Sequence, residues 1–177
     1  LTKTDAASEF RYRDALLDRQ SMVIAISQSG ETADTLAAIK EAKSRGVLSL
    51  GITNVVGSSQ ARETDAGVYT RTGPEVAVAS TKAFTSQLTI LGLMTLVLGR
   101  QRNMSRVTGQ KLAEGLRRIP DLAARTLESH DQVQELAHKY MEYDNLLYLG
   151  RKYSYPAALE GALKIKEIAY VHAEGGH

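Results

Sequence analysis

The chain of 177 residues predicts an α/β fold, in which a parallel sheet lies between layers of helices as a three-layer α/β/α sandwich. Short apolar runs of strand length alternate with segments of helical spacing, which is the order expected for parallel strands with helical crossovers. The runs are apolar nearly throughout, as is typical of strands that are covered on both faces. A polar loop follows the first run directly, at the edge of the sheet where such folds bind ligands.

The first half of the chain contains three strand candidates. Met22 to Ile26 and Val47 to Thr53 are apolar runs rich in β-branched residues, and Ala66 to Thr70 is a third and shorter one. A helix is predicted between the first two strands, from Thr32 to Arg45. Gly46 stands where a helix-terminating glycine is expected.

The loop from Ser27 to Thr32 has residue types that favour an anion. The first turn of a helix has unpaired N–H groups and the positive end of the helix dipole. Ser27, Ser29 and Thr32 add hydroxyls, and Gly30 lets the backbone come close to a ligand. The loop matches neither the Walker pattern nor the dinucleotide glycine pattern. Spacing alone leaves an alternative open, a polar turn in which Ser or Thr caps the helix.

A second polar turn, Val78 to Lys82, precedes a helix predicted from Ala83 to Leu98. Ser80 or Thr81 is expected to cap this helix. Because the helix is apolar on most faces, we expect it to be buried or to pack against a partner subunit. Its first turn either converges on the same pocket as the first loop or is an ordinary helix cap. Its most apolar part, Leu88 to Leu98, is well short of the roughly 20 residues that span a bilayer.

The second half of the chain begins with helices and ends with the start of another α/β unit. We expect a first domain at 1–105, a helical connection at 106–137 and a second domain that starts at 138–177. Within this half the predicted elements are helices at 107–119, 122–127 and 133–141, a strand at 145–150 and a last helix at 156–172.

The last helix is mostly apolar, but Glu160, Lys164 and Glu167 recur at i, i+4 and i+7 and therefore share one narrow stripe. One interpretation is a stripe exposed to water, with a Glu160–Lys164 pair worth about 0.3–0.5 kcal/mol. The other is a pocket in which apolar surroundings raise the pKa of a carboxylate, so that it can take a proton from carbon beside a carbonyl. Spacing alone does not decide between them.

Composition excludes several classes of function. The net charge of +2 and the scattered basic residues argue against a nucleic-acid surface. The absence of cysteine excludes disulfides, thiolate metal sites and thiol catalysis. The four histidines have no metal-binding spacing, and no signal peptide opens the sequence. We therefore expect a cytoplasmic protein without a metal site, which binds neither nucleic acid nor membrane.

Three long motifs resemble one known family. They are SQSGETADT at 27–35, GPEVAVASTKAFT at 73–85 and YPAALEGALKIKE at 155–167. In this order they are similar to the isomerase part of the glutamine:fructose-6-phosphate amidotransferases, also called glucosamine-6-phosphate synthases. The similarity runs in register along nearly the whole chain.

The resemblance implies two sugar isomerase (SIS) domains, each with a five-stranded parallel sheet, that pair into a homodimer. It implies the conversion of fructose 6-phosphate to glucosamine 6-phosphate, the first step toward UDP-N-acetylglucosamine. The ammonia comes from glutamine, which a separate N-terminal glutaminase domain hydrolyses. No metal or organic cofactor is implied.

The resemblance also implies roles for particular residues. A sugar-phosphate loop is implied at Ser27, Gln28, Ser29 and Thr32, and a lining of the sugar pocket at Val78 and Ser80. Glu167 matches the carboxylate that moves a proton between C1 and C2, and Lys164 matches the lysine one turn before it.

Some motifs of the family are missing. A further Ser/Thr loop would precede this sequence, and a Lys-His-Gly-Pro motif and a Schiff-base lysine would follow it. We therefore expect both SIS domains to be truncated and the polypeptide alone to be inactive, and we assign His177 no role. The alternative function is a non-catalytic SIS module that senses a sugar phosphate, which would need the loop at Ser27 but no base such as Glu167.

Overall fold

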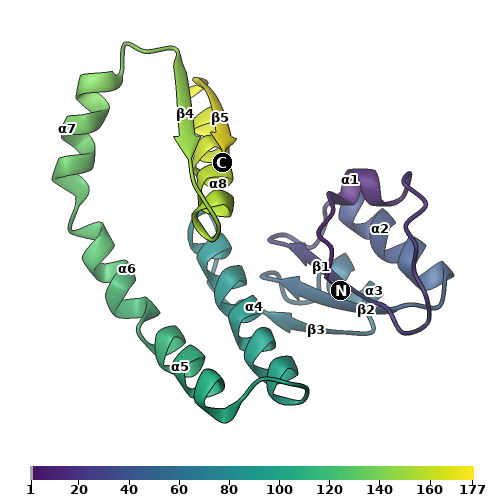
Figure 1. Cartoon of the computed structure of the whole chain (residues 1–177). Coiled ribbons are helices and arrows are strands. Elements are labelled where there is room, and N and C mark those ends of the chain that lie inside the picture. Colours follow the sequence, from purple (N-terminus) through teal and green to yellow (C-terminus); the bar gives the residue numbers. More distant parts are fainter. Residues whose placement is uncertain (1) are drawn as a thin grey trace. The chain divides into compact units, whose positions relative to one another are not determined.

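The computed structural model describes residues 2–177, which form two compact units (Figure 1). Unit 1 extends to Glu75 and also contains Thr81–Arg106, whereas unit 2 contains Val76–Ser80 and Val107–His177. Parallel strands and helices occur in both units, so the predicted α/β class is confirmed.

Unit 1 is built on a three-stranded parallel sheet. Its strands are β1 (Met22–Ser27), β2 (Leu48–Thr53) and β3 (Ala66–Tyr69), in the order β1-β2-β3. Met22 pairs with Leu48 and Ser27 with Thr53, so that β1 and β2 end at the same edge of the sheet. The loop after β1 therefore begins beside the loop after β2, where both can contribute to one site.

One face of this sheet is well covered. It packs against α2 (Ala33–Ser44) and the short α3 (Ser59–Glu63), and Ile39 of α2 is fully buried. Helix α2 ends at the predicted place, because Gly46 adopts φ +69° directly after the C-cap residue Arg45. A further short helix, α1 (Ala7–Phe10), lies against α2.

The other face of the sheet is less covered than predicted. Met94 of α4 (Lys82–Arg100) lies near β2 and β3, but Ile26, Leu48 and Val68 remain substantially exposed. Among the described residues, α4 therefore covers the second face only in part. Only Ala83 of α4 is buried, so this apolar helix is not buried within the described residues, and its packing against a partner subunit stays a prediction.

Helix α4 is also longer than its most apolar part. With 19 residues and a mean hydropathy of 1.3, it is long and apolar enough to cross a membrane by length and composition alone. The prediction that this segment is too short must be corrected, because the helix extends to Lys82 and Arg100 beyond the apolar run. Such a helix is weak support for a membrane span, since core helices of globular proteins meet the same criteria.

Unit 2 contains a helical part and a small sheet. The helices α5 (Arg106–Arg117), α6 (Ile119–Leu127) and α7 (His130–Tyr140) lie close to the predicted ranges, and Pro120 occupies the first turn of α6. Strand β4 (Asn145–Leu149) and helix α8 (Ser154–Ala169) follow, and β5 (His172–Gly176) pairs with β4 in parallel.

Several differences from the sequence prediction stand out. Helix α3 was not predicted. The last helix ends at Ala169 rather than at His172, because Tyr170 adopts the left-handed conformation at its C-cap. The following residues form β5. The resemblance implied five strands in each sheet, whereas the described residues supply three strands in unit 1 and two in unit 2.

Candidate functional site

The loop after β1 brings four predicted site residues together, Ser27, Gln28, Ser29 and Thr32. Ser27 Oγ accepts a hydrogen bond from the Gly30 N–H (3.1 Å) and lies 3.2 Å from Thr32 Oγ1. Ser29 Oγ accepts from the Glu31 N–H (3.2 Å). Ser29 keeps its hydroxyl proton to donate, and so does whichever hydroxyl of the Ser27–Thr32 pair accepts within that pair, so the loop can offer O–H groups to an anion.

The capped-turn alternative requires a Ser or Thr side chain to accept a hydrogen bond from the first turn of α2. Thr32 occupies the N-cap position, but its side chain makes no capping hydrogen bond. Its hydroxyl instead lies beside Ser27 Oγ. The Ser27–Thr32 pair therefore joins the two ends of the loop to each other.

Backbone contacts hold the loop on neighbouring segments. Gln28 O accepts from the Asn54 N–H (3.1 Å), and Gly30 O accepts from the Gln60 N–H (2.9 Å). Gly30 has φ +69°, and a Cβ there would lie 2.2 Å from Ser58 Oγ. Only glycine fits this position without strain, because both the conformation and the space exclude a side chain.

The second predicted turn, from Val78 to Ser80, is more open. Val78 is 88% exposed and Ser80 half-buried, and both belong to the segment that groups with unit 2. Of the two predicted caps of α4, Ser80 and Thr81, Thr81 takes the N-cap position, but its side chain makes no capping hydrogen bond. Glu75 Oε2 accepts from the Ala83 N–H (3.1 Å) at the start of α4 instead.

The charged stripe of α8 forms a three-residue ion-pair network. Lys164 Nζ lies 2.7 Å from Glu160 Oε1 and 3.6 Å from Glu167 Oε2. Burial acts to lower the pKa of Lys164, but the hydrogen bond and charge of Glu160, with the charge of Glu167, raise it above its ordinary value. Lys164 is therefore a fixed positive charge beside the Glu167 carboxylate.

The surroundings of Glu167 differ from the expected apolar pocket. Its side chain is 35% exposed, and its described charged neighbour is Lys164. Among the described residues, the stripe is thus neither fully solvated nor enclosed. It places one carboxylate within reach of solvent and 3.6 Å from a lysine.

The structure thus groups the predicted residues in two sets, one in each unit. The loop residues lie together in unit 1, and Lys164 and Glu167 lie together on α8 in unit 2. Sequence reasoning missed Glu31, Asn54 and Gln60, which form hydrogen bonds between the loop and neighbouring segments. A carboxylate inside a loop predicted to bind an anion was the one available signal for Glu31.

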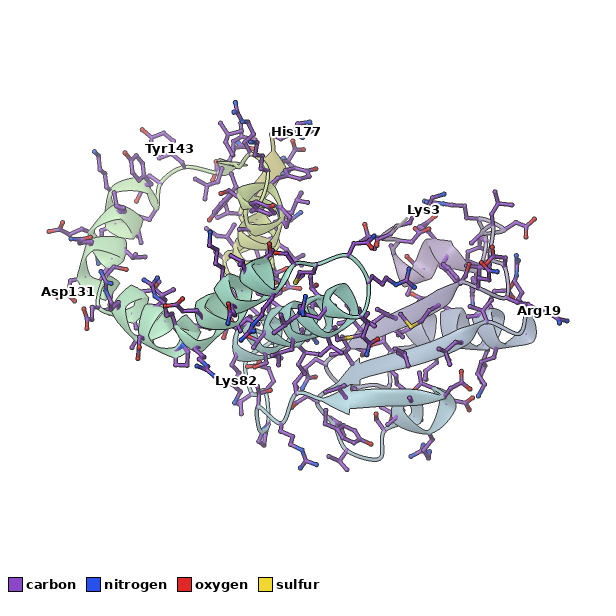
Figure 2. All side chains as sticks on the ribbon, turned by 60° about the horizontal axis from the view of Figure 1, so that its bottom comes forward. Lys3, Arg19, Lys82, Asp131, Tyr143 and His177 are labelled. Carbon is purple, nitrogen blue, oxygen red and sulfur yellow. The ribbon has the colours of Figure 1, made fainter. Side chains whose placement is uncertain are left out.

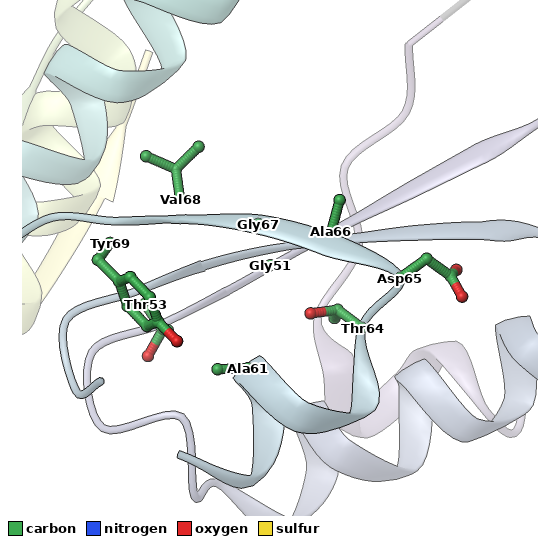
Figure 3. Close-up of a pocket in the computed structure, with 9 residues that line it drawn as sticks. All are labelled: Gly51, Thr53, Ala61, Thr64, Asp65, Ala66, Gly67, Val68 and Tyr69. Atoms are coloured by element: carbon green, nitrogen blue, oxygen red, sulfur yellow. The ribbon is translucent and has the colours of Figure 1, made fainter. Parts of the chain in front are cut away.

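A separate hollow of about 130 Å³ lies between α3 and the sheet (Figure 3). Tyr69, Thr53 and Ala61 lie on the helix side of β3, whereas Val68 and Ala66 point the other way. None of the predicted site residues lines this hollow.

Two further features of residues 2–177 are the distribution of metal-ligand side chains and that of polar side chains. No group of three or more His, Cys, Asp or Glu side chains there is placed to hold a metal ion. Side chains that end in nitrogen and side chains that end in oxygen are mixed over both units (Figure 2). Arg19 on unit 1 and Asp131 on unit 2 are examples.

The model of the SIS domain family matches residues 2–97, more than half of the chain. The chain belongs to the SIS domain family. The assignment agrees with the parallel sheet of unit 1 and with the polar loop after its first strand. The rest of this SIS chain is covered by comparisons with individual proteins.

Among its relatives are two enzymes named glutamine–fructose-6-phosphate aminotransferase (isomerizing). That of Chlorobaculum tepidum is 51% identical over 98% of this chain, and that of Aquifex aeolicus is 47% identical over 98%. The SIS chain spans 28% of the length of each of these curated relatives.

Solved structures agree with this family. The C-terminal domain of glucosamine-fructose-6-phosphate aminotransferase from Francisella tularensis has a TM-score of 0.91 at 42% identity, with 95% of this chain and 48% of that chain covered. Glucosamine-6-phosphate deaminase from Thermotoga maritima has a TM-score of 0.65 at 20% identity, with 95% of this chain and 49% of that chain covered. At that identity the deaminase shows the shared fold alone.

Proposed function

We propose that this chain supplies part of the isomerase module of a glutamine–fructose-6-phosphate aminotransferase, which makes glucosamine 6-phosphate from fructose 6-phosphate. The observation that carries the proposal is the loop after β1, with hydroxyls and backbone N–H groups at the carboxyl edge of a parallel sheet. Relatives about 50% identical along nearly the whole chain bear this enzyme name.

The loop residues Ser27, Gln28, Ser29 and Thr32 bind the phosphate of the sugar. The hydroxyls donate to the phosphate oxygens, and the first turn of α2 adds the positive end of its dipole. Val78 and Ser80 are proposed to line the sugar. This binding fixes the sugar at the end remote from its reacting carbons.

Glu167 moves the proton between C1 and C2 of the open-chain sugar. Its carboxylate accepts a proton from one carbon and returns it to the neighbouring one. Lys164 holds a positive charge 3.6 Å from the Glu167 carboxylate, where it stabilises negative charge on the adjacent oxygen of an enediol-like state. Glu160, at 2.7 Å from Lys164 Nζ, keeps the ammonium in place.

The same proposal covers partners and location. The enzyme is a cytoplasmic homodimer, and it receives ammonia from the glutaminase domain of the same full-length protein. The 177 residues alone are proposed to bind sugar phosphate without completing the reaction, because they span 28% of the relatives.

Binding of fructose 6-phosphate and of fructose to the full-length protein tests the phosphate role. A double variant, Ser29→Ala with Thr32→Ala, removes two hydroxyls from the loop. We expect it to weaken fructose 6-phosphate binding by about 100-fold or more, since two bonds to a charged group are lost and each is worth roughly 1.5–3 kcal/mol. Fructose binding should change little. Equal affinity of the variant and the wild type for fructose 6-phosphate would place the phosphate elsewhere.

A further inference from the structure

Glu31 is an unusual residue for a phosphate-binding loop. It lies between Gly30 and Thr32, and its negative charge would repel a phosphate if the side chain turned toward the ligand. The loop has no Lys or Arg of its own to offset that charge. The position of the carboxylate therefore needs a physical reason.

The Glu31 side chain is engaged with α3 rather than with its own loop. Glu31 Oε1 accepts a hydrogen bond of 2.8 Å from the Ser59 N–H, at the first residue of α3. This bond lowers the pKa of Glu31 below its ordinary value, and the charge of Arg62 on α3 acts in the same direction. The carboxylate is thus held as an anion by a partner outside the loop.

A second bond joins the same two segments one residue away. Gly30 O accepts from the Gln60 N–H at 2.9 Å, so consecutive residues of the loop bind consecutive residues of α3. Helix α3 is itself fixed to the sheet, because the fully buried Gln60 donates from Nε2 to Ala25 O and Ile52 O, both at 3.1 Å.

We propose that the Glu31 carboxylate is a positioning residue, which holds the loop 27–32 on α3 so that its N–H and O–H groups face the phosphate. This inference rests on the proposed function, because it assigns the loop to phosphate. Glu31 itself does not touch the substrate. Its carboxylate accepts the hydrogen bond from the Ser59 N–H, and this bond fixes the backbone between Gly30 and Thr32.

Positioning and simple charge repulsion predict opposite results. If Glu31 positions the loop, Glu31→Ala loosens the loop and weakens binding of both fructose 6-phosphate and inorganic phosphate. If Glu31 merely repels anions, Glu31→Ala and Glu31→Gln both tighten binding. Glu31→Gln separates the two further, since its amide oxygen can still accept from Ser59 while the charge is gone.

The experiment measures affinity for fructose 6-phosphate and for inorganic phosphate, together with KM and kcat, on the full-length protein. We expect Glu31→Ala to raise both dissociation constants by about tenfold and Glu31→Gln by about threefold, as the loss and the weakening of one charge-assisted hydrogen bond. KM should rise while kcat stays within about twofold, since the lost binding is shared by ground and transition states.

Glu63 provides the matched control. It is also on α3, and in the described part of the chain its carboxylate has no hydrogen bond or ion pair. Glu63→Ala and Glu63→Gln should leave both affinities unchanged. If Glu31→Ala does not fold, Glu31→Asp decides, because its shorter side chain keeps the charge but cannot maintain the 2.8 Å bond.

The outcomes are distinct. In the first outcome the wild type binds fructose 6-phosphate and phosphate, and Glu31→Ala, or Glu31→Asp in its place, binds them equally well or more tightly. This result overturns the role of Glu31 and leaves the proposed function intact. A wild-type protein that binds neither fructose 6-phosphate nor phosphate overturns both. Weaker binding restored in part by Glu31→Gln supports the positioning role.

Discussion

Asp65 ties the start of β3 to the start of β2 through a single carboxylate. Asp65 Oδ2 accepts from the Ser49 N–H and from Ser49 Oγ, both at 2.8 Å. These bonds, first the one from the Ser49 backbone and then the one from its hydroxyl, lower the pKa of Asp65 below its ordinary value. The folded protein therefore favours the ionised carboxylate.

The resulting pH dependence has a defined sign. Because the folded pKa is lowered, the stabilisation by Asp65 is complete above the ordinary aspartate pKa and is lost as the pH falls through the folded value. We expect Asp65→Asn to reduce stability at neutral pH and to flatten the decline of stability in acid. Urea unfolding from neutral to acidic pH measures this. An unchanged slope in acid would show that Asp65 does not contribute.

Gly30 and Gly46 permit a comparison of two glycines with the same backbone conformation. Both have φ +69°. A Cβ at Gly30 would lie 2.2 Å from Ser58 Oγ, whereas a Cβ at Gly46 would have no atom within 4 Å. Gly46→Ala should cost about 1–2 kcal/mol of unfolding free energy from backbone strain alone. Gly30→Ala should cost clearly more, because the clash adds to the strain. Denaturant titration measures both, and equal losses would contradict the close approach.

At the scale of elements, one buried side chain of α3 joins this helix to the sheet. Gln60 donates from Nε2 to Ala25 O and Ile52 O, and so joins the helix to β1 and β2. We expect Gln60→Met, of similar length but without the donor, to lower the free energy of unfolding by about 1–3 kcal/mol, because two bonds in a buried place are lost. Wild-type stability in this variant would mean that other donors already satisfy both carbonyls.

The sequence predicted elements with a clear local pattern and missed those made by tertiary pairing. β1 and α2 were found because an apolar run, a polar loop and helical spacing follow one another. Helix α3 was missed because its five residues, four of them polar, are too few to show a period. β5 was missed because His172–Gly176 has no strong strand former, and its pairing with β4 makes it a strand.

The candidate site was predictable to a similar extent. The hydroxyls of Ser27, Ser29 and Thr32 follow from residue type and from their place after a strand. The ion pairs of Lys164 follow from helical spacing. The contact between Glu31 and Ser59 joins residues far apart in the sequence, so no local pattern indicates it.

At the scale of the whole molecule, two environments suit the apolar surface of α4, the inside of a larger protein and a lipid bilayer. It is long and apolar, and Leu88, Leu93 and Val97 are each about half exposed. Under the proposed function these side chains pack within the complete enzyme rather than in lipid, as is typical of an apolar helix inside a globular protein. We expect the full-length protein in the aqueous fraction of lysed cells without detergent. Recovery only from detergent-extracted membranes would contradict this.

The central claim is that a sugar held at the loop 27–32 is isomerised with Glu167 as the base. The most direct measurement compares full-length wild type with Glu167→Gln for fructose 6-phosphate binding and for proton transfer between C1 and C2. We expect binding within about twofold and proton transfer at least about 100-fold slower, the usual contribution of a general base. Unchanged proton transfer with normal binding would contradict the claim.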